Sequence, residues 1–385
     1  MKQMKETAEA VIIGGGVVGL ATAYNLARRG MKDVVLLESS YLGSGATGRC
    51  GAGIRQQWGT EMNCKLARGS MDIFENMEER LQVDHDIGLK QGGYLLLAFS
   101  ESEMEQFRKN IELQNSLDIP AREVTTREAE EIVPHLNPAG IKGGAFCPTD
   151  GHADPFKVVD AYAEAAARLG VDINTYTSAL DIEKDKSGKI AGVVTDKGFI
   201  STPRVINAAG GYSSQIGEMV DLDLPVKPER HEILVTERVE PIQEPMVMSF
   251  SYNIYCQQTP KGPFIMGFGD PEEPESLNIN SSWQFLQEMA DKAVNLLPVL
   301  KRIRVIRQWA GLYTITPDRQ PIIAEADEVP GFYMATGFSG HGFMIAPMTA
   351  IILAEKITGQ TPRMDLELDL GRFERGDLIL EPSVV

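Results

Sequence analysis

The chain has 385 residues, enough for two domains that each enclose a hydrophobic core. Its formal net charge is −17, and its 37 Lys and Arg residues form no long basic segment, so nucleic acids and anionic membrane surfaces are poor candidates as partners. The four cysteines show no CxxC spacing, which predicts neither a disulfide framework nor a metal site.

The N-terminus leads directly into an apolar run and lacks the pattern of a signal peptide. The longest apolar stretch, residues 342–354, contains Pro347 and is too short to span a bilayer. We therefore expect a cytoplasmic protein without a transmembrane segment, whose contact with membranes is at most peripheral.

The first predicted unit contains a glycine-rich turn. Residues 10–13 are an apolar run of the kind that fills a buried parallel strand. Gly14, Gly16 and Gly19 follow in a GxGxxG pattern, and residues 20–27 carry apolar side chains at helical spacing. Glycines at these positions allow a tight turn and a close approach of the backbone to a pyrophosphate, which would lie at the N-terminus of the helix.

A second apolar run, residues 34–37, ends in Glu38, which lies 24 residues after Gly14. An acid at this place can accept hydrogen bonds from a ribose diol, and its charge disfavours a ribose with a 2′-phosphate. The complete pattern favours a dinucleotide site over a glycine-rich turn in an ordinary α/β unit.

Further elements are predicted from apolar spacing, capping residues and breakers. In chain order they are a strand at 93–98, helices at 101–117 and 125–132, a strand at 143–147, a helix from Asp154 to Leu169, strands at 171–181, 190–195 and 205–211, strands at 233–235, 252–257 and 264–267, a helix at 282–297, a strand at 303–312 and a last helix after Gly342.

This order predicts an α/β fold with interleaved domains. Residues 1–85, 145–215 and 316–385 are expected to form a Rossmann-like dinucleotide-binding domain. Residues 86–144 and 216–315 are expected to form a smaller substrate domain, built on an antiparallel or mixed sheet with flanking helices.

Several further motifs point to one family. They are Gly-Ser-Gly-Ala-Thr-Gly-Arg-Cys-Gly at 43–51, Gly-Ile-Arg-Gln-Gln at 53–57, Pro-Thr-Asp-Gly at 148–151, Ala-Asp-Pro-Phe at 153–156, Thr-Pro-Asp at 316–318, Gly-Phe-Ser-Gly-His-Gly-Phe at 337–343 and Arg-Phe-Glu-Arg-Gly at 372–376. With them nearly the whole chain resembles the D-amino-acid-oxidase superfamily of flavoenzymes. Within it, the chain resembles the sarcosine oxidase β-subunit group, and especially the β subunits of dye-linked L-proline dehydrogenases.

The resemblance implies an FAD that lies extended in the first domain, with its flavin ring at the domain boundary. A reduced flavin carries negative charge near N1 and O2, and the N-terminus of the helix that begins near Gly342 would stabilise that charge. The cofactor-binding residues implied are Gly14, Gly16, Gly19, Glu38, Ser39, Ser44, Gly45, Thr47, Arg49, Cys50, Ala208, Gly210, Gly337, Gly340, His341, Gly342 and Phe343.

The sequence departs from this family at cofactor positions. Gly311 stands where many monomeric sarcosine oxidases carry the cysteine that bonds covalently to FAD, so we expect non-covalent FAD. Pro155 stands near the place where heterotetrameric sarcosine oxidases attach FMN to a histidine, and His152 is not clearly equivalent. Any FMN at a subunit interface would therefore be non-covalent.

Two lysines of the oxidases are also replaced. Ile265 aligns with the lysine that activates oxygen over flavin N5, and Met344 aligns with a lysine that binds the substrate carboxylate. Without a cation near N5, superoxide formation is disfavoured, which favours a dehydrogenase.

The candidate catalytic residues are Arg55, Arg49 and His341. A guanidinium grips a carboxylate through two parallel hydrogen bonds, so Arg55, with help from Arg49, is the candidate carboxylate clamp. Each residue also has a plain structural interpretation, and for His341 an anchored turn residue is favoured over a proton carrier.

Among the other polar and aromatic residues, His231 is expected to be structural. Four aromatic residues are candidates for a pocket wall or for core packing, namely Tyr252, Tyr255, Trp309 and Tyr313.

We predict an FAD-dependent dehydrogenase that oxidises a small secondary α-amino acid, L-proline being favoured over sarcosine-like substrates. It would transfer hydride to flavin N5 as the catalytic subunit of a hetero-oligomer, with electrons leaving through a partner subunit. The alternatives are a stand-alone oxidase of glycine, sarcosine or a D-amino acid that releases hydrogen peroxide, and a non-catalytic flavin-bearing subunit.

Overall fold

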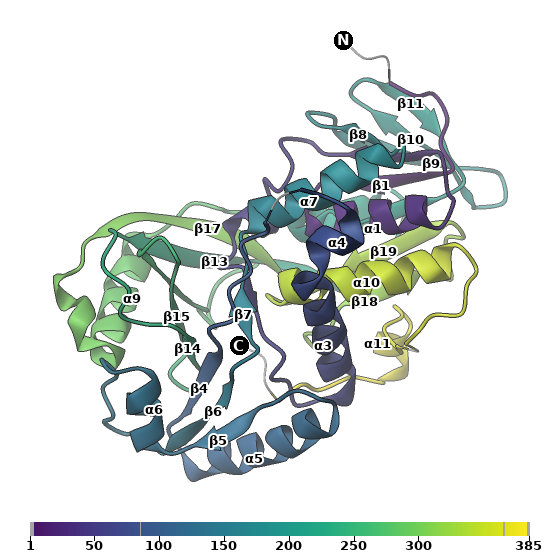
Figure 1. The fold of residues 1–385 in the computed structure, drawn as a ribbon. Helices are drawn as coiled ribbons and strands as arrows, with labels where there is room; N and C mark the ends of the chain where they lie inside the picture. Colours follow the sequence, from purple (N-terminus) through teal and green to yellow (C-terminus); the bar gives the residue numbers. More distant parts are fainter. Residues whose placement is uncertain (1–3, 85, 365, 383–385) are drawn as a thin grey trace.

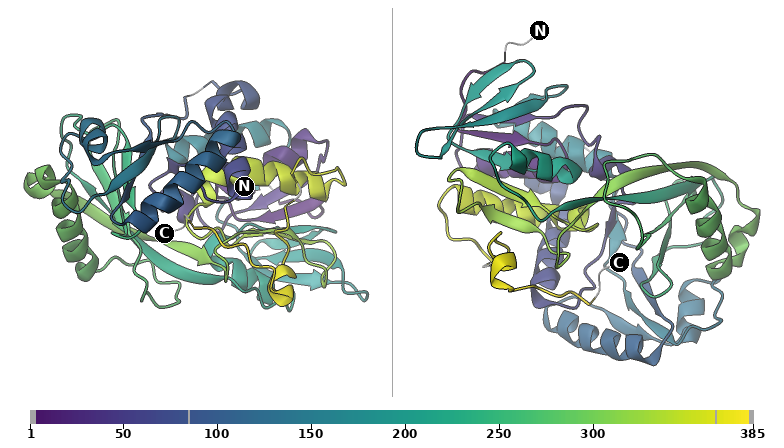
Figure 2. Two further views of the ribbon diagram at one scale, coloured as in Figure 1. Left: turned by 90° about the horizontal axis from the view of Figure 1, so that it is seen from below. Right: turned by 180° about the vertical axis from the view of Figure 1, so that it is seen from behind.

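The computed structural model describes residues 4–84, 86–364 and 366–382 and confirms the predicted α/β fold. Its two large β-sheets belong to two lobes that lie side by side (Figures 1 and 2). None of the helices within the described ranges is long and apolar enough to cross a membrane.

A six-stranded sheet forms the centre of the first lobe. Its strands are parallel except for β18, which pairs antiparallel with β19. The order is β18 (Ile322–Glu325), β19 (Phe332–Thr336), β12 (Val205–Asn207), β1 (Ala10–Ile13), β2 (Val34–Leu37) and β8 (Asp172–Asn174). All residues of β1 and β2 are buried, as expected for strands covered on both faces.

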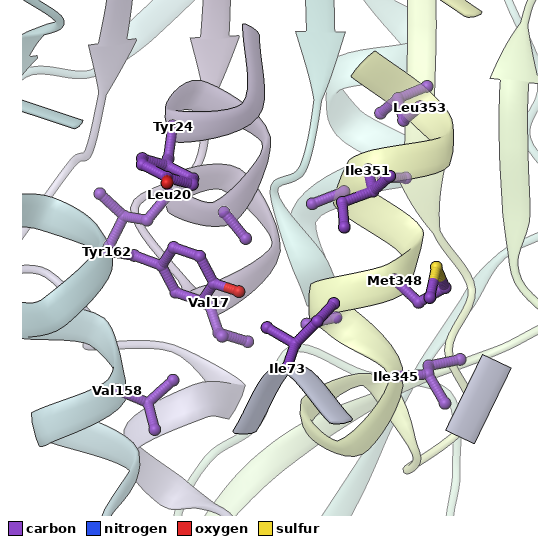
Figure 3. Close-up of a cluster of buried hydrophobic side chains, with 14 of the residues drawn as sticks. Val17, Leu20, Tyr24, Ile73, Val158, Tyr162, Ile345, Met348, Ile351 and Leu353 are labelled. Carbon is purple, nitrogen blue, oxygen red and sulfur yellow. The ribbon is translucent and has the colours of Figure 1, made fainter. Parts of the chain in front are cut away.

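One face of this sheet is covered by α1 (Val17–Arg28), α7 (Pro155–Arg168) and α10 (Gly342–Ile357), and α3 (Glu61–Glu75) packs on α10. Figure 3 shows their side chains meeting in the core, with Leu20 from α1, Ile73 from α3, Tyr162 from α7 and Ile351 from α10. The other face packs against a three-stranded sheet of β11 (Gly198–Ser201), β10 (Ile190–Thr195) and β9 (Ala179–Lys184).

The expected single strand at 171–181 is wrong, because the chain there forms β8 and β9 in two different sheets. Tyr176 between them has a positive φ of 51°. Its amide and that of Thr177 donate to the carbonyl oxygens of Ser40 and Glu38, so the connection follows the end of β2 instead of extending β8.

The second lobe contains an eight-stranded mixed sheet. Its order is β17 (Val305–Ile315), β13 (Lys227–Thr236), β16 (Phe264–Phe268), β15 (Ile254–Gln258), β14 (Met246–Ser249), β4 (Tyr94–Ala98), β6 (Gly143–Cys147) and β5 (Arg122–Val124). Only β14 and β4 pair parallel. Side chains of α6 (Thr126–Ile132) and α9 (Trp283–Leu296) pack on one face, and those of α5 (Glu101–Ser116) on the other.

Strand β14 has no counterpart among the strands predicted from the sequence. Strand β6, which pairs with both β4 and β5, spans the predicted boundary at residue 145. The division into domains stays a prediction. The remaining elements are α2 (Ala46–Arg49), β3 (Gly53–Ile54), α4 (Met77–Leu81), β7 (Gly151–His152), the 3₁₀ turns η1 (Gly210–Tyr212) and η2 (Pro298–Arg302), α8 (Ser213–Glu218) and α11 (Arg372–Arg375).

Candidate active site

A cavity of about 640 Å³ connects the two lobes. One end lies at the carboxyl ends of β1 and β2, where Gly14 and Glu38 line it. The other end lies against the eight-stranded sheet, where Tyr94, Met246 and Tyr255 line it. All predicted site residues line this cavity except Gly19 and Gly337.

Gly14 and Gly19 in the first glycine turn have no room for a side chain. Gly14 has a φ of +120°, and a β-carbon there would overlap the carbonyl oxygen of Ala208. A β-carbon on Gly19 would overlap the carbonyl oxygen of Gly14, which explains the third glycine although its position is outside the cavity. The turn therefore places the N-terminus of α1 at the cavity, where the helix dipole favours the binding of an anion.

Glu38 is buried at the end of β2 and is fixed by donors. Its Oε2 accepts from the amide of Gly15 at 2.8 Å. Its Oε1 accepts from the amide of Ser40 at 2.8 Å and from the hydroxyl of Ser44 at 3.2 Å. The carboxylate is thus oriented in the cavity wall before any ligand binds.

The segment around α2 forms the next part of the wall. Thr47 Oγ1 accepts from the amide of Val17 at 3.2 Å, which links α2 to α1. Burial raises the pKa of the Cys50 thiol to about 11, so Cys50 is protonated at neutral pH. Arg49 donates from Nε to the Ser44 carbonyl and from Nη1 to the Ala310 carbonyl, both at 3.0 Å. These two hydrogen bonds hold α2 against β17. Arg55 is therefore the better candidate for binding the substrate carboxylate.

Arg55 follows β3 and is only 3% exposed. Its Nη1 donates to the Gln57 carbonyl at 2.7 Å, and its guanidinium lies 3.9 Å from the centroid of the Trp58 ring. Burial lowers the pKa of Arg55, while the nearby acids Glu381 and Asp150 oppose this shift. An arginine keeps its proton in proteins, so Arg55 places a fixed positive charge at this end of the cavity.

Asp150, from the Pro-Thr-Asp-Gly motif, fixes the chain next to Arg55. It is fully buried and accepts from the amide of Gln56 at 2.8 Å and from Nε2 of Gln57 at 3.0 Å. Burial raises the pKa of its carboxyl to about 6, against the lowering effect of these donors. The sequence singled out this motif without giving Asp150 a role.

His231, Tyr255 and Tyr313 form a stacked wall. The His231 ring lies 4.2 Å from the Tyr313 ring centroid, nearly parallel to it, and its Nε2 is 3.0 Å from the Tyr255 hydroxyl. Burial lowers the pKa of His231 to about 4, so the imidazole is neutral at pH 7. All three residues line the cavity, which gives His231 a place in the site that the sequence did not predict.

The other two aromatic candidates lie outside the cavity wall. Tyr252 stacks on Phe99 at 5.5 Å, and Trp309 donates from Nε1 to the Arg49 carbonyl at 2.9 Å. Tyr94, Met246 and Met248 line the cavity instead. Only the neighbouring strands of one sheet bring these residues to the cavity, because no local sequence pattern connects residue 94 with residue 246.

The second glycine turn packs over Tyr313. Gly340 has a φ of +93°, and a β-carbon there would approach Cε2 of Tyr313 to 2.5 Å. His341 precedes α10, and its ring lies 5.0 Å from the Trp58 ring. Burial and the charge of Arg55 lower the pKa of His341 to about 3, which disfavours a role as proton carrier at neutral pH.

The three replaced positions lie at or beside the cavity. Gly311 and Met344 line it, and a β-carbon on Gly311 would come within 3.2 Å of Cβ of Arg49. Ile265 does not line the cavity but lies behind Gly51, which does.

A glycine-rich turn lies at the carboxyl end of a mostly parallel sheet, and a cavity joins it to a second sheet. This arrangement is typical of a two-lobed nucleotide-dependent enzyme. The model of the FAD dependent oxidoreductase family (DAO) matches residues 9–356, and the chain belongs to this family. It is therefore an FAD-dependent oxidoreductase.

Three similar proteins show the range of this family. The crystal structure of L-proline dehydrogenase from P. horikoshii is 37% identical, with a TM-score of 0.92 over 98% of this chain and 100% of that chain. Sarcosine oxidase subunit beta of Arthrobacter sp is 30% identical over 98% of this chain and 94% of its own length. Mitochondrial dimethylglycine dehydrogenase of Rattus norvegicus is 29% identical over 96% of this chain, which spans only 45% of that protein.

The site fits FAD by its own chemistry. The amides at the start of α1 suit a pyrophosphate, the oriented carboxylate of Glu38 suits a ribose, and the glycines at 14 and 340 keep the cradle free of side chains. An FMN site has no such support in the described residues. Contacts of individual residues with FAD stay predictions.

Proposed function

We propose that this protein is an amino-acid dehydrogenase that oxidises a small secondary α-amino acid, L-proline above all, with non-covalently bound FAD. One observation carries the proposal: a buried arginine stacked on Trp58 faces the same cavity as an apolar and aromatic wall. The similarity to a solved L-proline dehydrogenase along the whole chain supports the choice of substrate.

The charge of Arg55 matches the substrate carboxylate. A buried guanidinium can bind a carboxylate through two parallel hydrogen bonds, and Arg55 is held by Gln57 and Trp58 in one orientation. The remaining wall of Met246, Met248 and Tyr94 suits the methylene groups of a small ring.

FAD when bound accepts a hydride, so no acid–base pair from the protein is obligatory. The carbon–hydrogen bond next to the amine breaks with its electron pair, the amine proton goes to solvent, and an imine forms. The residues of this chain orient that bond through the carboxylate. The neutral His231 and the Tyr255 hydroxyl supply polar contacts that fit an amine without adding a second cation.

Electrons would leave through a partner subunit, as the similarity to a sarcosine oxidase β subunit suggests. FMN at the interface is one route for them.

The decisive experiment is an anaerobic screen. The purified protein would be mixed with L-proline, D-proline, hydroxyproline, sarcosine and glycine, and flavin bleaching would be followed by absorbance. We expect the fastest bleaching with L-proline. Bleaching by none of them would reject the proposal and favour the non-catalytic subunit.

An oxidase is the second candidate function, and Ile265 argues against it. Superoxide formation is helped by a positive charge near flavin N5, and neither Ile265 nor the adjoining Gly51 supplies one. Reduced protein mixed with air-saturated buffer should reoxidise much more slowly than it turns over with a dye acceptor. Equally fast reoxidation would replace the dehydrogenase by the oxidase.

Non-covalent attachment has its own check. Gly311 offers no thiol, and the Cys50 thiol is protonated and therefore a poor nucleophile. Acid precipitation should release all yellow colour into the supernatant, and colour in the pellet would contradict this.

A further inference from the structure

The segment after α11, residues 376–382, folds back to the turn that follows Arg55. Arg372, fully buried, donates to Asp318 from Nε at 2.8 Å and from Nη2 at 3.0 Å. The same carboxylate accepts from the amide of Ile379 at 3.4 Å. Two of the family motifs, Thr-Pro-Asp and Arg-Phe-Glu-Arg-Gly, thus hold the segment that follows α11 in place.

Glu381 in this segment binds the N-terminus of α3. It accepts from the amide of Gly59 at 2.8 Å, from the amide of Thr60 at 3.1 Å, from the Thr60 hydroxyl at 2.7 Å and from Nδ2 of Asn63 at 3.0 Å. Thr60 is the N-cap residue of α3 but makes no capping hydrogen bond with its own side chain. Glu381 supplies the cap instead, and a negative charge there also suits the helix dipole.

The turn that Glu381 holds is the one that carries Arg55. Arg55 donates to the Gln57 carbonyl and stacks on Trp58, and Nε1 of Trp58 donates back to the Arg55 carbonyl at 3.0 Å. Pro382 packs on the next residue, since a β-carbon on Gly59 would overlap it. The charge of Glu381 also acts favourably on the buried guanidinium. One carboxylate therefore controls both the position and the electrostatic environment of Arg55.

We propose that Glu381 is a positioning residue for substrate binding, so that the C-terminal segment completes the site in which Arg55 grips a carboxylate. This inference rests on the proposed function, because it takes Arg55 as the clamp. It implies that changes at the C-terminus weaken binding of the substrate and leave the chemical step nearly unchanged.

The test uses the full chain with FAD bound. Four variants are compared with the wild type: Glu381→Ala, Glu381→Gln, Thr60→Val and, as the control, Glu374→Gln, which changes an exposed acid of α11. Tetrahydro-2-furoate, a ring carboxylate without an amine, is titrated while flavin absorbance is recorded. KM and kcat for L-proline are measured with a dye acceptor, together with Tm.

We expect Glu381→Ala to raise the Kd of tetrahydro-2-furoate and the KM for L-proline about tenfold, with kcat within about twofold. Glu381→Gln should fall between, because an amide oxygen still accepts hydrogen bonds but holds the turn less firmly than a carboxylate does. Thr60→Val removes one of the four hydrogen bonds and should raise both constants about twofold to threefold. Glu374→Gln should match the wild type.

A lower Tm with unchanged Kd and KM in Glu381→Ala would overturn the inference and leave Glu381 as a helix cap only. If that variant does not fold, unchanged constants in Glu381→Gln and Thr60→Val overturn it equally. The proposed function fails in a different way, namely when no amino acid bleaches the wild-type flavin.

Discussion

The two ends of the cavity are built in different ways. The dinucleotide end comes mainly from one continuous unit, namely β1, the glycine turn, α1, β2 and Glu38. The substrate end comes from Arg55 after β3, Tyr94 on β4 and strands of the eight-stranded sheet that are remote in sequence. Backbone geometry therefore determines the first end, whereas side-chain packing between remote segments determines the second.

The largest effect should come from breaking backbone geometry at the dinucleotide end. Gly14→Ala places a β-carbon at a φ of +120° and against the Ala208 carbonyl, at a cost of about 2–6 kcal/mol. We expect the purified variant to lack flavin and to unfold at a lower temperature.

Gly30→Ala is the matched control: Gly30 has a φ of +94° but no atom within 4 Å of the added carbon. Its cost should be only about 1–2 kcal/mol, from backbone strain without a clash, with flavin retained. Equal flavin content in both variants would contradict the packing explanation.

At the substrate end, Arg55→Lys keeps the charge and loses the planar fork. Transition-state binding should weaken by about 2–4 kcal/mol, the range for a buried charged pair that loses one partner's geometry. Arg49→Lys should cost less, because Arg49 binds backbone carbonyls. Both losses are measured as steady-state kcat/KM for L-proline. A change below about threefold for Arg55→Lys would contradict the role of Arg55 in binding the carboxylate.

A smaller effect is expected from Tyr255→Phe, which removes only the hydroxyl beside His231. The loss of one buried hydrogen bond should cost about 1 kcal/mol, or about fivefold in kcat/KM. Tyr252→Phe is the control, since Tyr252 stacks on Phe99 outside the cavity. Equal losses in the two variants would show that the wall is core packing alone.

A further effect concerns the pH dependence of stability. Burial holds the pKa of His231 at about 4, below the 6.5 of the unfolded chain, so the unfolded chain binds more protons between these values. This histidine therefore lowers stability as pH falls from 6.5 to 4. Asp150 acts oppositely, because its raised pKa of about 6 lets the folded state bind the extra proton between 3.8 and 6.

In a Tm series from pH 7 to 4, His231→Gln should lose a few degrees less than the wild type. If Tm falls equally with pH in the wild type and in His231→Gln, the imidazole of His231 is charged in the folded protein.

The amino-acid sequence by itself determined the class of fold and the dinucleotide end of the site. Gly19 is required for a local reason, since a β-carbon there meets the Gly14 carbonyl, whereas a β-carbon on Gly14 meets the Ala208 carbonyl after β12. The family motifs likewise singled out Arg55, which lines the same cavity because residues 43–57 form one local segment that follows β2.

Only the tertiary structure decided which residues face the substrate and which hold them. His231 and Tyr255 sit in strands whose sequence predicts burial, and the choice between core and cavity depends on what packs opposite. Asp150 and Glu381 carry charges that could equally be exposed. They reach the amides around Gln57 and Thr60 only because β7 and the C-terminal segment fold back to β3 and α3. Such contacts between remote segments leave no periodic signal in the sequence, because each depends on the whole path of the chain between its partners.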